Sequence, residues 1–187
     1  WDMKREHKGK LYIAIACILL FAVTNVFSAE FTGFLFNKTK FELVDFLFEL
    51  EKVGIIFLLI CTANWSVTTL LDGEGTFRDI VMVFGYSCLP ISLIKIPTAI
   101  ISNIASYSES VYINILNAGA MIWFVVLLFF GFMTIHQYTL SKMLLTTLLT
   151  IVAAAVIMFV YLLFFSLITQ MGTFIATIYK EMSFRLR

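Results

Sequence analysis

Charged residues are scarce in this chain of 187 residues: 13% are Asp, Glu, Lys or Arg, while 61% are hydrophobic. An ordinary soluble domain has about 25% charged residues, so a water-soluble fold of this length would lack the polar surface that it needs. The charges balance to a net +1, which gives no electrostatic basis for binding nucleic acid. The low charge therefore indicates a membrane protein without a nucleic-acid partner.

Residues that hold metals or perform covalent chemistry are equally sparse. The three cysteines lie in apolar stretches and resemble small buried hydrophobes, because neither disulfide pairing nor zinc-ligand spacing is present. The sequence also lacks the glycine motifs of nucleotide sites, the Gly-x-Ser-x-Gly nucleophile motif and the His-Glu-x-x-His zinc motif. We therefore expect no enzymatic activity, no cofactor and no metal ion.

Long uncharged stretches are what the chain has instead. A helix needs about 20 apolar residues to cross the roughly 30 Å hydrocarbon layer, and a charge at its centre costs roughly 2.5 to 3.5 kcal/mol. Four uncharged stretches meet this requirement, at residues 11–29, 53–71, 113–135 and 143–168, and a fifth stretch at 80–106 meets it apart from one charge, Lys95. The sequence predicts an all-α, polytopic membrane helical bundle with five transmembrane helices, in a single domain over residues 1–187.

Two amphipathic segments flank these spans. In residues 41–52 the polar side chains recur three or four positions apart, which places them on one helical face. Residues 169–187 carry three basic side chains beside apolar ones, and Thr169, Gln170 and Gly172 interrupt the preceding apolar run. We expect an acidic interfacial helix and a basic amphipathic tail that rest on membrane lipids.

The orientation follows from the first span. With five spans, Lys and Arg outside the spans divide six against six between the two sides, so the positive-inside rule alone does not decide. The first helix usually dominates, and four of its flanking basic residues precede it, namely Lys4, Arg5, Lys8 and Lys10. The prediction is an N-terminus in the cytoplasm and a C-terminus outside.

The loop at residues 72–79 is the first candidate site. Gly73 is expected in the left-handed conformation that ends a helix, and Thr76 is expected to cap the next helix with Asp79 completing a capping box. A cation site made of Asp72, Glu74 and Asp79 is an alternative, but calcium-loop spacing is absent. The functional hypothesis is a partner-docking loop that comprises Asp72, Gly73, Glu74, Gly75, Phe77, Arg78 and Asp79.

The third span contains the second candidate site. Pro90 and Pro97 each remove a backbone donor, and such breaks survive in lipid only where neighbours restore the bonds, so we expect a kinked helix inside the bundle. Gly85 would allow another helix to approach closely. Lys95 is the one charged residue well inside a span and hence a functional candidate; structural alternatives are that it snorkels or donates to a carbonyl freed by Pro97. The candidate intramembrane residues are Gly85, Tyr86, Pro90, Lys95, Pro97, Asn64 and His136.

Short motifs follow one another in order through nearly the whole chain. They are Trp1-Asp2-x-Lys4, Thr32-Gly33-Phe34-Leu35-Phe36-Asn37, Ala63-Asn64-Trp65, Asp72-Gly73-Glu74-Gly75-x-Phe77-x-Asp79, Gly85-Tyr86-x-x-x-Pro90 and His136-Gln137-Tyr138. This order resembles the Yip family, the Ypt/Rab-interacting membrane proteins, in its bacterial form. The resemblance implies five spans, a cytoplasmic N-terminus and a place in the bacterial cytoplasmic membrane. Eukaryotic relatives bind small GTPases in vesicle trafficking, but their long N-terminal cytosolic region is lacking here, so we do not expect a GTPase partner.

Three functions fit these features. The main hypothesis is a non-enzymatic membrane scaffold or accessory subunit that binds another membrane protein, or itself, through the third span and the 72–79 loop. The alternative is a small transporter or channel in which Lys95 and the broken third span line a polar path. The second alternative is a lipid-organising or membrane-shaping protein that acts through the two amphipathic segments.

Overall fold

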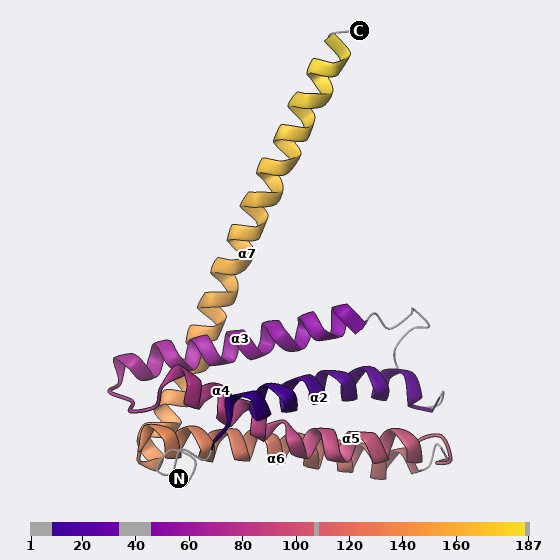
Figure 1. The fold of residues 1–187 in the computed structure, drawn as a ribbon, viewed down its shortest axis with the longest axis vertical. Helices are drawn as coiled ribbons and strands as arrows, with labels where there is room; N and C mark the ends of the chain where they lie inside the picture. Colours follow the sequence, from indigo (N-terminus) through magenta and orange to yellow (C-terminus); the bar gives the residue numbers. More distant parts are fainter. Residues whose placement is uncertain (1–8, 34–45, 107–108, 186–187) are drawn as a thin grey trace.

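The computed structural model describes residues 9–33, 46–106 and 109–185. These residues form helices and no strand. The helices are α2 (Leu11–Phe31), α3 (Phe46–Leu70), α4 (Phe77–Ser87), α5 (Leu89–Ile101), α6 (Ser110–His136) and α7 (Leu140–Arg185). Helices α2 to α6 run alongside one another, while α7 starts at one end of this bundle and rises away from it (Figure 1). The predicted all-α class is confirmed.

Four segments of the described chain are long and apolar enough to cross a membrane: α2, the α4–α5 pair, α6, and α7 as far as Met182. They contain the predicted first, fourth and fifth spans, whereas the predicted third span, residues 80–106, extends five residues past the end of α5 at Ile101. Helix α3 contains the predicted second span, residues 53–71 apart from its last residue, and packs in the same bundle. The structure is therefore a helical membrane bundle, and the crossing of α3 stays a prediction.

The α4–α5 pair forms the centre of the bundle. In its most apolar window 56% of the residues are buried, against 22% in α2 and 17% in α6. The pair is interrupted at Cys88, and Pro90 lies in the first turn of α5. Proline is tolerated there because the backbone N–H groups of the first turn have no acceptor within the helix. The predicted interruption near Pro90 and the place of this span inside the bundle are confirmed, whereas the break expected at Pro97 is absent, because α5 continues through Pro97 to Ile101.

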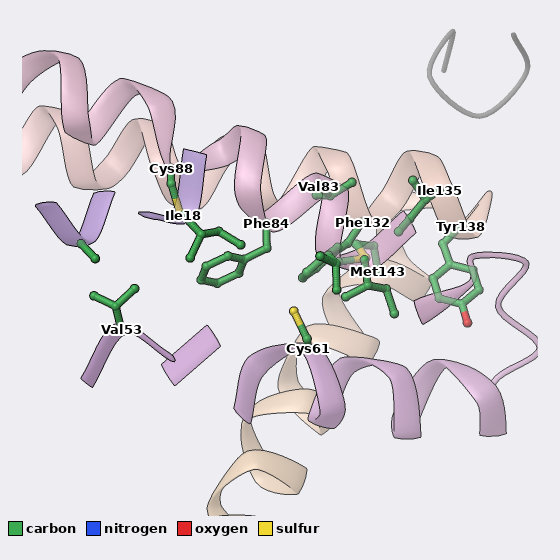
Figure 2. Close-up of a cluster of buried hydrophobic side chains, with 13 residues drawn as sticks. Ile18, Val53, Cys61, Val83, Phe84, Cys88, Phe132, Ile135, Tyr138 and Met143 are labelled. Carbon is green, nitrogen blue, oxygen red and sulfur yellow. The ribbon is translucent and has the colours of Figure 1, made fainter. Parts of the chain in front are cut away.

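Buried apolar side chains of α2, α3, α4, α6 and the start of α7 form one core cluster (Figure 2). Phe84 of α4 lies 5.2 Å from Phe57 and 5.8 Å from Phe124, measured between ring centroids. A Cβ atom on Gly85 would lie 2.5 Å from the backbone oxygen of Ala14, so α2 and α4 meet backbone to backbone. The close approach expected at Gly85 is confirmed.

Buried hydroxyl groups bond to their own helices. Thr24, Thr68 and Ser87 each donate to the carbonyl four residues earlier, at 2.8, 2.8 and 2.7 Å. Such bonds satisfy hydroxyls where lipid offers no partner. No enclosed side-chain nitrogen or oxygen in the described part of the chain lacks a hydrogen-bond partner.

The structure joins two segments that the sequence pattern separates. Residues 46–52, which belong to the predicted interfacial helix, continue into the second span as the single helix α3, while residues 41–45 lie outside the described part. Helix α7 likewise passes Gly172 without a break, because one glycine in a helix costs only about 1 kcal/mol. The limits of the fifth crossing and the basic tail at 169–187 stay predictions.

Only the first turns of α7 are anchored in the bundle. Met143 and Thr146 are buried, whereas every residue from 155 to 182 except Ile157 is exposed. A helix rises 1.5 Å per residue, so the 46 residues of α7 extend about 69 Å, more than twice the hydrocarbon thickness. This helix therefore tilts strongly in the bilayer or leaves it.

Candidate functional site

The loop between α3 and α4 starts from a left-handed residue. Asp72 has a φ of 52°, and the Gly73 N–H donates to the Thr68 carbonyl at 2.8 Å, which is the bond of a Schellman ending. The prediction that Gly73 takes the left-handed conformation is wrong. Asp72 takes it, because a short polar side chain tolerates this conformation.

Gly73 and Gly75 are needed for a different reason, the ring of His136. A Cβ atom on Gly73 would lie 2.6 Å from His136 Nδ1, and one on Gly75 would lie 2.7 Å from His136 Cε1. These distances are too short for real contacts, so any larger residue would displace the loop or the ring. The loop therefore packs its backbone directly against the end of α6.

His136 fixes the loop through a hydrogen bond as well. Its side chain is 1% exposed, and Nδ1 accepts a bond from the Gly75 N–H at 3.2 Å. Because Nδ1 acts as the acceptor, the ring hydrogen of the neutral imidazole is on Nε2. Nε2 in turn lies 3.4 Å from Oδ1 of Asn64 in α3, so the imidazole links α3 to the loop.

Tyr138 completes this arrangement from the chain that follows α6. Gln137 ends α6 with a φ of 55°, and the turn brings Tyr138 onto His136, with ring centroids 5.4 Å apart and planes 24° apart. The Tyr138 hydroxyl donates to the carbonyl of Leu71 at 3.0 Å. Burial first, and then the Asp72 carboxylate, raise the pKa of Tyr138 above 10.0, which keeps the donating hydroxyl protonated.

The other end of the loop is held by the predicted capping box, which is confirmed. The Asp79 N–H donates to Thr76 Oγ1 at 3.3 Å, and the Thr76 N–H donates to Asp79 Oδ2 at 3.0 Å. Asp79 therefore serves α4 itself. In the part of the chain that the structure describes, no group of three or more His, Cys, Asp or Glu side chains is placed to hold a metal ion.

Several residues at this loop are exposed on the surface. Asp72, Glu74, Phe77 and Arg78 are exposed. The Phe77 ring meets the exposed ring of Trp65 edge to face, with centroids 6.0 Å apart. These five residues, Trp65, Asp72, Glu74, Phe77 and Arg78, are called the docking surface below.

The third-span candidates form a separate group on α4 and α5. Lys95 neither snorkels to the surface nor bonds to a carbonyl freed by Pro97; its Nζ atom donates to Oδ1 of Asn25 in α2 at 2.6 Å and lies 5.8 Å from the centroid of Phe21. The Tyr86 hydroxyl donates to the Lys10 carbonyl at 3.4 Å. These contacts tie α4 and α5 to α2.

The structure thus brings together only some of the predicted residues. Asn64, His136 and the 72–79 loop meet at one end of the bundle, while Lys95 and Pro97 lie in α5, which runs away from that end (Figure 1). Sequence reasoning missed Asn25 as the partner of Lys95. The sequence does contain a signal for this contact, because the amide side chain of Asn25 lies inside an uncharged span, where it needs a polar partner on another helix.

Apolar helices that span a lipid layer, with an interrupted helix at the centre, define an integral, multi-pass membrane protein. The sequence model of the Yip1 domain family matches residues 1–163. The chain belongs to this family, as its order of motifs predicted. No curated protein and no solved structure gives a significant match.

Proposed function

We propose that this Yip1 domain protein is a non-enzymatic scaffold or accessory subunit that binds another membrane protein through the docking surface. The observation that supports it is an exposed set of side chains on a backbone held from behind. The Gly73 N–H bond to the Thr68 carbonyl and the capping box fix the two ends of the loop, and the Gly75 N–H bond to His136 holds the backbone between them. A loop that is already ordered loses little conformational entropy on binding.

The composition of the docking surface suits protein recognition. Aromatic residues and Arg are enriched at interface centres and carry much of the binding energy. Trp65 and Phe77 supply a packed aromatic pair, and Arg78 stands next to it in the chain. Asp72 and Glu74 add acidic groups at the rim, so a partner with an apolar patch and mixed charge is expected.

The absence of enzymatic activity is part of this proposal. His136 is a natural candidate for a general base, but its Nδ1 atom accepts the Gly75 N–H, and its Nε2 atom carries the hydrogen that faces Asn64. A base needs an acceptor nitrogen within reach of the reacting group. The ring is therefore committed to holding the loop.

The transporter alternative receives less support from the contacts of Lys95. Its ammonium group donates a hydrogen bond to Asn25 and lies over the Phe21 ring, so these contacts favour a structural role for Lys95 as a link between α2 and α5.

The location proposed for the protein is the bacterial cytoplasmic membrane, with the N-terminus and the docking surface in the cytoplasm.

Site-specific photo-crosslinking in native membranes tests the proposal. A benzophenone amino acid at position 77 is expected to capture a membrane protein that the same probe at position 112 does not capture. Tyr112 is a matched control, because it is an exposed aromatic residue at the other end of the bundle, near the start of α6.

A charge reversal, Arg78→Glu, made alongside the probe should lower the yield of that adduct about tenfold, which corresponds to the loss of a good charged interface contact. Identical adducts at positions 77 and 112, or adducts with lipid alone, would contradict the proposal.

A further inference from the structure

A cavity of about 210 Å³ lies between α3, α6 and α7. Its walls are almost entirely apolar. They comprise Ile60, Val125, Leu128, Phe129, Phe132 and Met143, with Thr147, Thr150, Ile151 and Ala154 along α7 and Asn64 of α3. The lining residues of α7 belong to its first turns, where this helix diverges from the bundle (Figure 1).

Asn64 presents a hydrogen-bond donor to this cavity. Its Oδ1 atom faces the Nε2–H group of His136, so the remaining polar group of the amide is the Nδ2 donor, which has no acceptor among the described residues. No enclosed side-chain nitrogen in that part of the chain lacks a partner. Nδ2 is therefore reached from the cavity, although Asn64 is only 1% exposed.

The cavity is elongated and opens to the lipid. On α7 it extends from Met143 to Ala154, a length of about 16 Å at 1.5 Å per residue. Met143 and Phe132 are buried, whereas Val125 and Ile151 are more than half exposed on the side of the spans. The Asn64 donor lies toward the end where His136 terminates α6, so the apolar channel leads from that donor toward the middle of the membrane.

A long apolar channel with one donor near the membrane surface has the chemistry of an acyl ester. Water does not suit it, because apolar cavities of this size stay dry and one donor supplies too few bonds for a chain of waters. We infer that the cavity binds one acyl chain of a membrane glycerolipid, whose ester carbonyl accepts a hydrogen bond from Asn64 Nδ2. This site is separate from the docking surface and does not depend on the proposed function.

The carbonyl assignment is tested with two matched lipids. The purified protein is equilibrated in mixed micelles with equal amounts of an ester-linked phosphatidylglycerol and its diether analogue, and retained lipid is counted by native mass spectrometry. The ester lipid is expected to be retained about three- to tenfold more, as one hydrogen bond would give. In Asn64→Leu this ratio should fall to about one. Equal retention by the wild type would overturn the assignment.

The position of the chain is tested with a pair of neighbouring alanines. Ala154 lines the cavity, while Ala155 is exposed, so Ala154→Trp fills the cavity and Ala155→Trp adds the same ring outside it. With a phosphatidylglycerol that carries a diazirine in its acyl chain, adducts on residues 125–132 should fall about fivefold or more in Ala154→Trp and stay unchanged in Ala155→Trp, because only the first removes the volume.

Adducts in the wild type should also exceed those on residues 159–168 of α7, which are exposed and outside the cavity. Adducts spread evenly over both stretches, or an equal effect of the two Trp variants, would overturn the proposal. If Ala154→Trp does not fold, this wild-type comparison and the ester-to-ether ratio decide.

Discussion

At the scale of single residues, the imidazole ring of His136 packs directly against the backbone of two glycines, Gly73 and Gly75. The loop needs glycine at both positions because a Cβ atom there would collide with the His136 ring. Unusual backbone angles are not the reason, since no glycine in the described residues has a positive φ. The ring in turn joins the loop to Asn64. A substitution at any of these positions therefore acts on the loop as a whole.

Replacing Gly75 by Ala should lower the free energy of unfolding by about 1 to 3 kcal/mol, the usual cost of overpacking a filled site. The new Cβ would lie 2.7 Å from His136 Cε1. Thermal unfolding in detergent can be followed with a thiol-reactive dye, because Cys17, Cys61 and Cys88 are free and buried. Gly119→Ala is the control: a Cβ there meets nothing within 4 Å. Equal stability of the two variants would contradict the packing argument.

Tyr138 gives the loop a dependence on high pH. Its pKa is raised above 10.0 in the folded protein by burial and by the Asp72 carboxylate, so the unfolded chain ionises first. The stabilising effect of Tyr138 is complete below pH 10 and is lost as the pH rises from about 10 through the folded pKa. Melting temperatures measured from pH 8 to 11 should decline more steeply for the wild type than for Tyr138→Phe. Parallel curves would show that Tyr138 does not titrate with folding.

Local chemistry made part of this site predictable from sequence. Thr76 and Asp79 form the expected capping box because both partners lie within one helical turn. The contact between His136 and Gly75 spans 61 positions, and no local rule specifies it. The same distance in sequence explains why Asp72, rather than Gly73, takes the left-handed conformation: packing against a remote ring requires the glycine one position later.

At the scale of helices, α5 is attached to α2 by one charged hydrogen bond. Lys95 Nζ and Asn25 Oδ1 are 2.6 Å apart, and the bond lies between two apolar helices, where an unpaired ammonium is costly. This bond accounts for a lysine in a span without invoking transport. It predicts that the two residues are energetically coupled.

A double-mutant cycle measures this coupling. Asn25→Leu should destabilise the protein by about 2 kcal/mol, because it leaves the Lys95 charge unpaired. Adding Lys95→Met should recover part of that loss, since the double variant buries neither charge nor amide. The unfolding assay used for Gly75→Ala serves here too. Strictly additive effects would show that the two side chains act independently.

Composition predicts where the long helices lie, but it does not predict where each helix begins and ends. The uncharged stretches locate every long helix, because exclusion of charge from lipid is a property of composition. Composition does not show whether a helix stops at a membrane boundary. Helix α3 runs from Phe46 through Glu49 and Lys52, which form an ion pair at 2.6 Å, and neither residue interrupts the backbone bonds.

At the scale of the whole molecule, most of α7 makes no buried contact with the other helices. Its first turns pack on α3 and line the cavity between α3, α6 and α7, and the remaining residues as far as Met182 are not buried. Apolar side chains over such a length are stable in lipid and unfavourable in water. The bilayer therefore has to cover most of α7, and the last turns with Lys180 and Arg185 are the place for the helix to reach the opposite surface.

We therefore predict that the 72–79 loop and the last turns of α7 lie on opposite sides of the membrane. Single cysteines placed at Glu74 and at Lys180, in a background without the three native cysteines, should differ in labelling by a membrane-impermeant maleimide added to intact cells. Position 180 should react, and position 74 should react only after the cells are opened. An odd number of crossings between these two sites, namely the α4–α5 pair, α6 and α7, requires this difference. Labelling of both sites from the same side would show that one of these three segments does not cross, and reaction of position 74 in intact cells would place the docking surface outside the cytoplasm.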